Sequence, residues 1–254
     1  MPKTIMITGA SSGFGKALAY RFAENGNQLI LTGRRSENLE SLQKELQTLY
    51  KIEVHISVFD VRLKQEVFDA INSLPEDFRK IDILINNAGL ALGRDLFQEA
   101  EMDDWETMMQ TNVMGLLYVT RAVLPLMKIA QQRHIINIGS IAGKEVYEKG
   151  NVYCASKAAV DSLSKAMRID LLSEGIKVTA IHPGAAETEF SKVRFKGDEE
   201  KAAAIYKGYR PLSAEDVAEV VYFTTTLPEH VCINDLVLTC TAQANSFYTH
   251  KKNG

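Results

Sequence analysis

A short apolar run that ends in a cluster of glycines limits what this chain can fold into more than any other feature. Residues 4–8 read TIMIT, and residues 9–15 read GASSGFG before apolar residues recur at helical spacing. A strand that turns on glycines into a helix begins a βαβ unit, and the helix N-terminus offers free N–H groups to phosphate. The sequence therefore predicts a phosphate-binding turn. Because the spacing is GxxxGxG rather than GxGxxG, a glycine-rich turn without a ligand remains the alternative.

Further apolar runs of β type alternate with stretches of helical period. They cover residues 28–32, 53–59, 81–85, 134–138, 177–181 and 235–241. Runs such as QLILT and HIINI are apolar on both faces, which is typical of a parallel sheet covered by helices on both sides. Right-handed crossovers then predict an α/β doubly wound Rossmann fold with seven parallel strands flanked by helices on both faces.

Residues 1–254 are interpreted as a single domain, since no linker or repeat divides them. The polar stretch at about 184–208 follows a strand end and is expected to be a loop that covers a ligand. Gly26 and Gly175 are expected to end helices, and Ser213 is expected to begin one.

Composition excludes several kinds of partner. A net charge of -3 gives no general attraction to nucleic acid or anionic lipid. Cys154, Cys232 and Cys240 lack the spacing of a disulfide framework or a zinc site, so no metal is expected. No stretch approaches the ~20 apolar residues that span a bilayer, and the N-terminal run is too short for a signal peptide. We therefore expect a cytoplasmic protein without nucleic acid or membrane partners.

Residues at the strand ends indicate a nucleotide site. The second strand ends in Arg34 and Arg35, where an NAD site carries a carboxylate for the ribose 2′-OH. Two guanidinium groups instead favour a 2′-phosphate, which predicts NADP, although the pair could simply begin the next helix. The cofactor-binding residues predicted from the sequence alone are Gly9, Ala10, Ser11, Ser12, Gly13, Phe14, Gly15, Arg34, Arg35, Asp60, Val61, Asn87, Ala88 and Gly89.

Tyr153 and Lys157 lie four residues apart in a helix that is predicted to open at YCASK, so they share one face. An adjacent ammonium favours the phenolate and lowers the pKa of a phenol, which lets Tyr153 exchange a proton with a substrate oxygen. Ser140 follows the strand HIINI, where its hydroxyl can hold a carbonyl, and Asn112 is the fourth candidate. A packed aromatic beside a solvated amine is the alternative for an isolated YxxxK pair.

Taken together, TGASSGFG, NNAG, Asn112, Ser140, YCASK and Pro183-Gly184 resemble the motif set of the short-chain dehydrogenases/reductases over nearly the whole chain. The resemblance implies that Tyr153 is the general acid/base and that Lys157 lowers its pKa and binds the nicotinamide ribose. It further implies that Ser140 orients the substrate and that Asn112 supports a water-linked proton relay. The residues implied to contact the nicotinamide are Tyr153, Lys157, Pro183, Gly184 and Thr188.

Longer runs, among them DWETMMQTNVMGLLYVTRAVLP and TEFSKVRFKGDEEKA, are similar to the NADP-dependent serine and 3-hydroxy acid dehydrogenases. This resemblance implies hydride transfer between NADP(H) and a small 3-hydroxy acid, such as serine, L-allo-threonine or 3-hydroxypropionate, or its semialdehyde or oxo form. It also implies a homotetramer. A substrate carboxylate needs a cation, and of Lys192, Arg194 and Lys196 we expect Arg194 to bind the substrate, together with Ser140 and Tyr153. A solvated basic loop over NADP is the alternative.

Two other functions stay open. A 3-oxoacyl-carrier-protein reductase or another carbonyl reductase shares these motifs, and the former would need a basic docking patch. Candidates for that patch are Arg121, Lys128, Arg133, Lys165 and Arg168. A non-catalytic NADP-binding regulatory protein is the second alternative, and the intact Asn–Ser–Tyr–Lys set argues against it. His182 is expected to be a structural polar group at a strand end.

Overall fold

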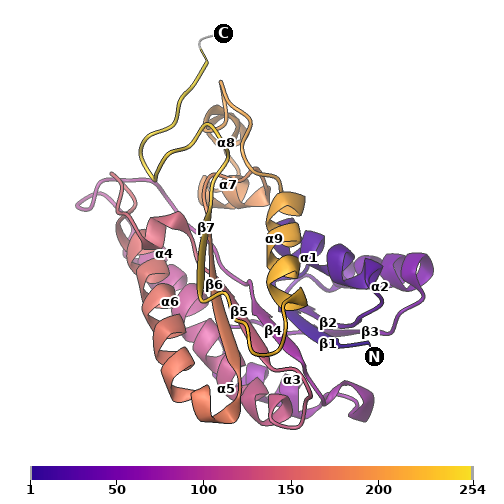
Figure 1. Ribbon diagram of the computed structural model, residues 1–254. Coiled ribbons are helices and arrows are strands. Elements are labelled where there is room, and N and C mark those ends of the chain that lie inside the picture. Colours follow the sequence, from indigo (N-terminus) through magenta and orange to yellow (C-terminus); the bar gives the residue numbers. More distant parts are fainter. Residues whose placement is uncertain (1, 253–254) are drawn as a thin grey trace.

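The strands of the computed structural model run parallel in a single sheet, and the structure describes residues 2–252 (Figure 1). The strands are β1 (Thr4–Thr8), β2 (Gln28–Gly33), β3 (Val54–Val58), β4 (Ile83–Asn86), β5 (His134–Ile138), β6 (Lys177–Pro183) and β7 (Asp235–Leu238). Their order is β3-β2-β1-β4-β5-β6-β7, with Thr4 beside Gln28 and Ile5 beside Ile83. The direction of winding reverses between β1 and β4, which is where open α/β sheets bind ligands.

The central strands are apolar on both faces because helices cover the sheet on both sides. The helices are α1 (Gly13–Glu24), α2 (Ser36–Tyr50), α3 (Lys64–Asn72), α4 (Met102–Met109), α5 (Leu116–Met127), α6 (Asn151–Asp170), α7 (Glu189–Arg194), α8 (Glu199–Ala204) and α9 (Ala214–Thr226). One apolar core packs α1, α2 and α9 against one face of the sheet, and a second packs α3 and α5 against the other (Figure 1). This arrangement confirms the predicted doubly wound fold.

Element ends follow the predicted signals with two differences. Gly26 has φ +71 after α1, and Ser213 caps α9 with its side chain. The long helix α6 stops at Asp170, however, and a 3-10 turn (Leu172–Glu174) comes before Gly175, which has φ +66. The last strand is also shorter than predicted, because residues 239–252 leave the sheet as an irregular segment.

A π-helical turn (Gln110–Gly115) joins α4 to α5, where the sequence predicts ordinary helix around Asn112. The turn packs tightly against the loop after β3, since a Cβ on Gly115 would lie 2.8 Å from a methyl carbon of Val61. Single π turns interrupt the regular hydrogen-bond ladder and are common at functional sites.

The predicted loop at 184–208 contains two short helices, α7 and α8, which lie beyond the end of β6 beside the C-terminal segment (Figure 1). Within residues 2–252, none of the helices combines the length and the apolar character needed to cross a membrane.

Candidate active site

A cavity of about 1270 Å³ opens at the carboxyl edge of the sheet. Of the site residues predicted above, all line this cavity except Ala10, Gly15 and Asn112. The glycine turn, the two arginines after β2, the Tyr–Lys pair and part of the segment 184–208 therefore surround one space. The strand ends bring these residues together although they are far apart in the sequence.

The glycines of the turn have two roles. Some of them face the cavity, and others allow close packing of the backbone. Gly9 has φ +65, and a Cβ there would lie 3.0 Å from the Cα of Ala88. A Cβ on Gly15 would lie 2.2 Å from the carbonyl oxygen of Gly9, so Gly15 lets α1 approach the strand end rather than touch a ligand. The N-cap residue Ser12 makes no capping hydrogen bond, which leaves the first N–H groups of α1 available to an anion.

The two arginines after β2 have different surroundings. Arg35 donates to the side-chain oxygens of Ser11 (3.2 Å) and Ser12 (2.5 Å), and it pairs with Glu189 of α7 at 3.1 Å. Arg34 extends toward solvent and lies 3.7 Å from Asp60. Arg35 is thus held beside the glycine turn, and both arginines line the cavity, where a phosphate on the second nucleotide sugar would bind.

Arg62 is a residue of this region that the sequence did not reveal. Its Nε and Nη2 atoms donate to both carboxylate oxygens of Asp60, at distances down to 2.6 Å. Arg62 therefore balances the charge of Asp60, so that this carboxylate does not cancel the charge of Arg34.

Tyr153 and Lys157 stand one helical turn apart on α6, and both are nearly buried, at 8% and 6% exposure. The Lys157 amine donates to the carbonyl oxygen of Ile138 at 2.9 Å. Burial lowers the pKa of Lys157 to about 8. Within residues 2–252, Lys157 makes no ion pair with a carboxylate.

Burial also dominates the titration of Tyr153, whose pKa lies well above that of a free phenol. Tyr147 raises the pKa further, and a hydrogen bond with the Ser140 side chain lowers it by less. The net pKa of Tyr153 is therefore raised in this arrangement of the protein's own side chains, and the predicted effect of Lys157 stays a prediction. The phenol is held in its protonated form, because removing the charged form from water outweighs the nearby donors.

Ser140 begins the 3-10 turn Ile141–Gly143 directly after β5. Its side-chain oxygen accepts a hydrogen bond from the backbone N–H of Ala142 at 3.1 Å. This contact leaves the hydroxyl hydrogen free to point toward the Tyr153 phenol or toward an oxygen bound beside it.

Asn112 lies behind the cavity wall in the π-helical turn and is 2% exposed. Its amide exchanges two hydrogen bonds of 2.8 Å with the backbone of Leu90 and donates to the Ser156 side chain at 3.0 Å. The side chain thus ties the loop after β4 to α6, and its polar atoms are occupied by protein groups.

Arg194 is the only one of the three predicted loop cations that lines the cavity. Its guanidinium carbon lies 5.4 Å from the ring centre of Tyr153 and 5.6 Å from that of Tyr147. Its Nη1 donates to the Tyr147 hydroxyl at 2.9 Å, and its Nε donates to the Gly93 carbonyl at 3.2 Å. Lys192 and Lys196 instead form exposed ion pairs with Glu199 and Asp104.

This position gives Arg194 an unusual electrostatic role. It is only 8% exposed, and among the described residues no carboxylate pairs with it. A buried guanidinium without an acid favours an anionic ligand, because an anion would supply both the charge and the acceptors that the site lacks.

Several residues around the cavity have no clear sequence signal. The Thr8 hydroxyl accepts from the backbone N–H groups of Asn87 (3.0 Å) and Ala88 (2.9 Å), which joins two strand ends. Gln243, from the C-terminal segment, accepts from Ala185 at 2.7 Å. Phe190 packs against Tyr153 with ring centres 5.7 Å apart. Only Thr8 carries a hint, as it directly precedes the first glycine.

The cavity as a whole fits a dinucleotide that carries an extra phosphate. The glycine turn and the N-terminus of α1 line the cavity together with Arg34 and Arg35. The same continuous space extends to the Tyr–Lys pair. Thr111 also lines this space, and its buried hydroxyl has no hydrogen-bond partner among the described residues. This hydroxyl is therefore available to bond a ligand.

Comparison with known proteins gives consistent matches over the chain. Residues 3–199 match the family model for short chain dehydrogenases. A sulfoacetaldehyde reductase of Chromohalobacter salexigens is 47% identical over 98% of each chain. An NADP-dependent 3-hydroxy acid dehydrogenase of Salmonella typhi is 48% identical over 91% of this chain and 92% of that protein. The closed form of a serine dehydrogenase with bound NADP+ matches at TM-score 0.92 and 44% identity, covering 98% of this chain and all of the other.

Proposed function

The chain belongs to the short-chain dehydrogenase family, and from that premise we propose that it is an NADP-dependent oxidoreductase acting on a small anionic substrate. The substrate alternates between a hydroxyl and an oxo form, as a 3-hydroxy acid and its semialdehyde do. The observation that carries the proposal is the buried Arg194 guanidinium, 5.4 Å from the Tyr153 ring and free of any carboxylate among the described residues.

The protonated Tyr153 phenol can act as the acid in the reduction of a carbonyl group. When bound, NADPH supplies the hydride to the carbonyl carbon. Ser140 donates a hydrogen bond to the carbonyl oxygen and orients it toward Tyr153. Tyr153 gives that oxygen its phenolic proton, and burial keeps this proton in place until it is needed because it raises the pKa of the phenol.

Lys157 and Asn112 have supporting roles in this proposal. The Lys157 amine, anchored on the Ile138 carbonyl, has two further donors for a sugar hydroxyl of the nicotinamide half of the cofactor. Asn112 keeps the Leu90 loop against α6 and so maintains the wall beside Lys157. Pro183, Gly184 and Thr188 line the part of the cavity where the nicotinamide amide would lie.

Arg194 selects the substrate by charge. A carboxylate or a sulfonate beside Tyr153 would accept from the guanidinium and neutralise it. The names of the relatives refer to hydroxy acids and to a sulfonate-bearing aldehyde. The Arg194 guanidinium can bind a carboxylate or a sulfonate. Because α7 carries Arg194, the segment at about 184–208 both binds the substrate and covers it.

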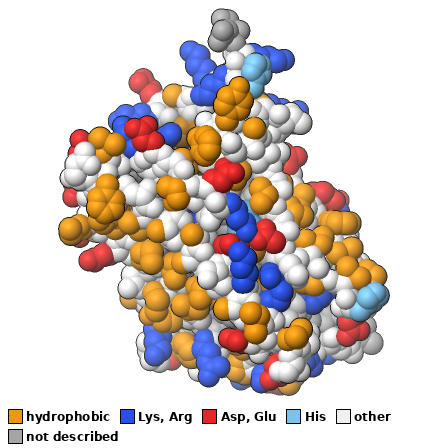
Figure 2. All heavy atoms as spheres, turned by 60° about the vertical axis from the view of Figure 1, so that its left-hand side comes forward, with side chains coloured by type: hydrophobic (Ala, Val, Ile, Leu, Met, Phe, Trp, Pro, Cys, Tyr) orange, Lys and Arg blue, Asp and Glu red, His pale blue; other side chains and the backbone are white. Residues whose placement is uncertain are grey.

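A carrier-protein reductase has less support from this surface. Lys128 pairs with Glu174, and Arg133 and Arg168 donate to backbone carbonyls. On the face in Figure 2, the basic side chains lie in small groups, several beside acidic ones, rather than as one patch. An acidic carrier would find little continuous positive charge there.

We take residues 1–254 as one domain and also propose a cytoplasmic homotetramer. The three cysteines, which lack the spacing of a disulfide framework, support the location, and the branch that the sequence resembles supports the assembly. Size-exclusion chromatography with light scattering tests the tetramer directly.

The reaction is tested by following oxidation of reduced nicotinamide with malonic semialdehyde, sulfoacetaldehyde, an uncharged aldehyde of similar size and an acetoacetyl thioester. We expect rapid NADPH-dependent reduction of the two anionic aldehydes and slow reduction of the others, with NADH inferior throughout. Equal rates for charged and uncharged aldehydes would remove the basis for an anionic substrate, and preference for the thioester would favour the carrier-protein alternative.

Replacing Arg35 by alanine is expected to weaken NADPH binding by about 10- to 100-fold and to leave NADH binding nearly unchanged. Only NADPH has the 2′-phosphate, and a charge-assisted hydrogen bond contributes about 1.5–3 kcal/mol. Fluorescence titration of both cofactors measures the two dissociation constants.

The matched control for that variant is Glu189→Gln, which breaks the same ion pair and keeps the cation. It is expected to bind NADPH at least as tightly as the wild type, because a competing carboxylate is gone. If Glu189→Gln and Arg35→Ala weaken NADPH binding equally, Arg35 acts by holding α7 and not by contacting phosphate.

A further inference from the structure

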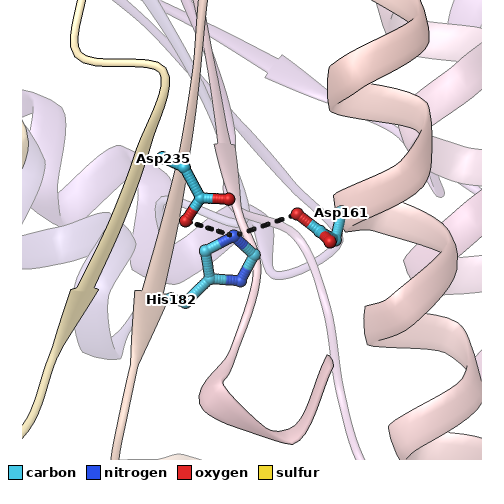
Figure 3. Close-up of side chains that lie close together, drawn as sticks. All are labelled: Asp161, His182 and Asp235. Carbon is cyan, nitrogen blue, oxygen red and sulfur yellow. Dashed lines mark ion pairs between the residues drawn. The ribbon is translucent and has the colours of Figure 1, made fainter. Parts of the chain in front are cut away.

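The side chain of His182 lies between the carboxylates of Asp161 and Asp235 (Figure 3), on the strand that ends at Pro183 in the cavity wall. His182 Nε2 lies 3.6 Å from a carboxylate oxygen of Asp161 and 3.6 Å from one of Asp235. Lys144 pairs with both carboxylates, and Lys165 pairs with Asp161 at 2.7 Å. These five residues, here called the His182 cluster, come from β6, α6, β7 and the turn after β5.

The hydrogen bonds of the cluster determine the form of the ring. Nδ1 lies 3.2 Å from the carbonyl oxygen of Ser140, which can only accept, so Nδ1 carries a hydrogen and donates it. Burial lowers the pKa of His182, and the Lys144 ammonium lowers it further against the opposing effect of the two carboxylates. Nε2 is fully buried and has no hydrogen-bond partner among the described residues.

A metal ion is not needed to explain this group of ligand-like atoms. The Lys144 ammonium already sits between the two carboxylates, and Lys165 supplies a second positive charge. Two ammonium groups balance two carboxylates, so a divalent cation would have to displace a bound lysine and leave excess charge.

The cluster holds the turn that carries Ser140 from both sides. A Cβ on Gly139 would lie 2.5 Å from His182 Nδ1, so the ring packs directly on the residue before Ser140. A Cβ on Gly143 would lie 2.5 Å from the backbone oxygen of Lys157, so the other end of the turn packs on α6. The Lys144–Asp161 pair fastens that end one helical turn beyond Lys157.

We propose that His182 is a positioning residue for the reaction: by donating from Nδ1 to the Ser140 carbonyl, it sets the direction of the Ser140 hydroxyl relative to the Tyr153 phenol. This role rests on the proposed function, in which Ser140 orients the substrate oxygen. His182 touches neither substrate nor cofactor in this scheme. Its loss displaces Ser140 while the glycine turn and the arginines after β2 remain in place.

Two amide substitutions separate this role from simple packing. In His182→Asn the amide nitrogen takes the place of Nδ1 and restores the donor to Ser140, whereas in His182→Gln the amide reaches the position of Nε2. We expect His182→Gln and His182→Phe to lower kcat by about 10- to 100-fold, the range that a small misplacement of a reacting group produces. His182→Asn should recover most of the wild-type kcat, and the Kd for NADPH should stay within about twofold in all three.

His134→Asn is the matched control, because His134 is also buried, on the neighbouring strand β5, and among the described residues its ring hydrogen-bonds the Thr179 side chain alone. It is expected to lower the thermal unfolding temperature without changing kcat per folded molecule. Equal kcat for His182→Asn and His182→Gln, or an unchanged kcat in His182→Phe, overturns the positioning role. A wild type that reduces no substrate with NADPH overturns the proposed function itself, and this role with it.

A measurement independent of activity examines the same hydrogen bond. Nitrogen NMR of labelled histidine is expected to show His182 protonated on Nδ1 and not on Nε2 at neutral pH. Lys144→Met should raise the pKa of His182, because it removes an ammonium that disfavours the charged ring. The charged groups that then remain near the ring are the carboxylates of Asp161 and Asp235 and the ammonium of Lys165. A wild-type ring protonated on Nε2 alone contradicts the proposal, because Nδ1 then has nothing to donate to Ser140.

Discussion

Tyr153→Phe is expected to lower kcat by about 10³- to 10⁴-fold, the largest effect of any single substitution in this chain. The change removes only the hydroxyl that delivers the proton to the substrate oxygen, and positioned acids contribute up to about 10⁴-fold to such steps. The ring keeps its contact with Phe190 and its place beneath Arg194. Steady-state reduction of an anionic aldehyde measures the loss, and NADPH titration measures cofactor binding, which should be unchanged.

Tyr147→Phe is the matched control for this prediction. Tyr147 also lines the cavity and also meets Arg194, but its hydroxyl accepts from the guanidinium instead of facing the Ser140 side chain. Its loss should change KM more than kcat. If Tyr153→Phe retains wild-type turnover, the proton comes from elsewhere. Should neither the wild type nor the variant turn over any substrate while both bind NADPH equally, the chain is a cofactor-binding regulatory protein.

Arg194→Met is expected to lower kcat/KM for anionic aldehydes by about 100-fold and to leave kcat/KM for a neutral aldehyde of the same size within a few-fold. The guanidinium is buried, so its charge-assisted hydrogen bonds to a substrate anion are little screened by solvent, and removing such a partner costs about 2–3 kcal/mol. Methionine retains an unbranched apolar stem but removes the guanidinium that lies against the two tyrosines. The paired substrates separate loss of charge recognition from a general disturbance of α7.

Lys192→Met, two residues earlier on α7, is the matched control because Lys192 is exposed and pairs with Glu199. It should affect neither substrate class. If Arg194→Met slows charged and neutral aldehydes alike, Arg194 closes α7 over the cavity through its contacts with Gly93 and does not select the substrate by charge.

The sheet and the candidate catalytic residues could be predicted from the sequence because their signals are local. Strand runs such as HIINI are apolar on both faces, and the glycine cluster directly follows the strand TIMIT. The spacing of Tyr153 and Lys157 places them on one face of any helix. Each of these features depends on a few consecutive residues.

Other features depend on contacts between distant segments and could not be read in this way. Arg62 matters only because it meets Asp60 in a particular loop, and Tyr147 matters because α7 brings Arg194 against it. The pKa of Tyr153 follows mainly from its burial, which no local sequence pattern reveals. His182 likewise gains its importance from residues on α6, β7 and the turn after β5.

The ion pair between Arg35 and Glu189 has a practical consequence for protein engineering. The usual route from NADP to NAD preference replaces an arginine after the second strand with a carboxylate for the ribose hydroxyl. In this chain that exchange would set two acids against each other at the first turn of α7 and remove the ion pair that links this helix to the segment after β2. Cofactor switching here therefore requires a second, compensating substitution at Glu189, designed together with the first.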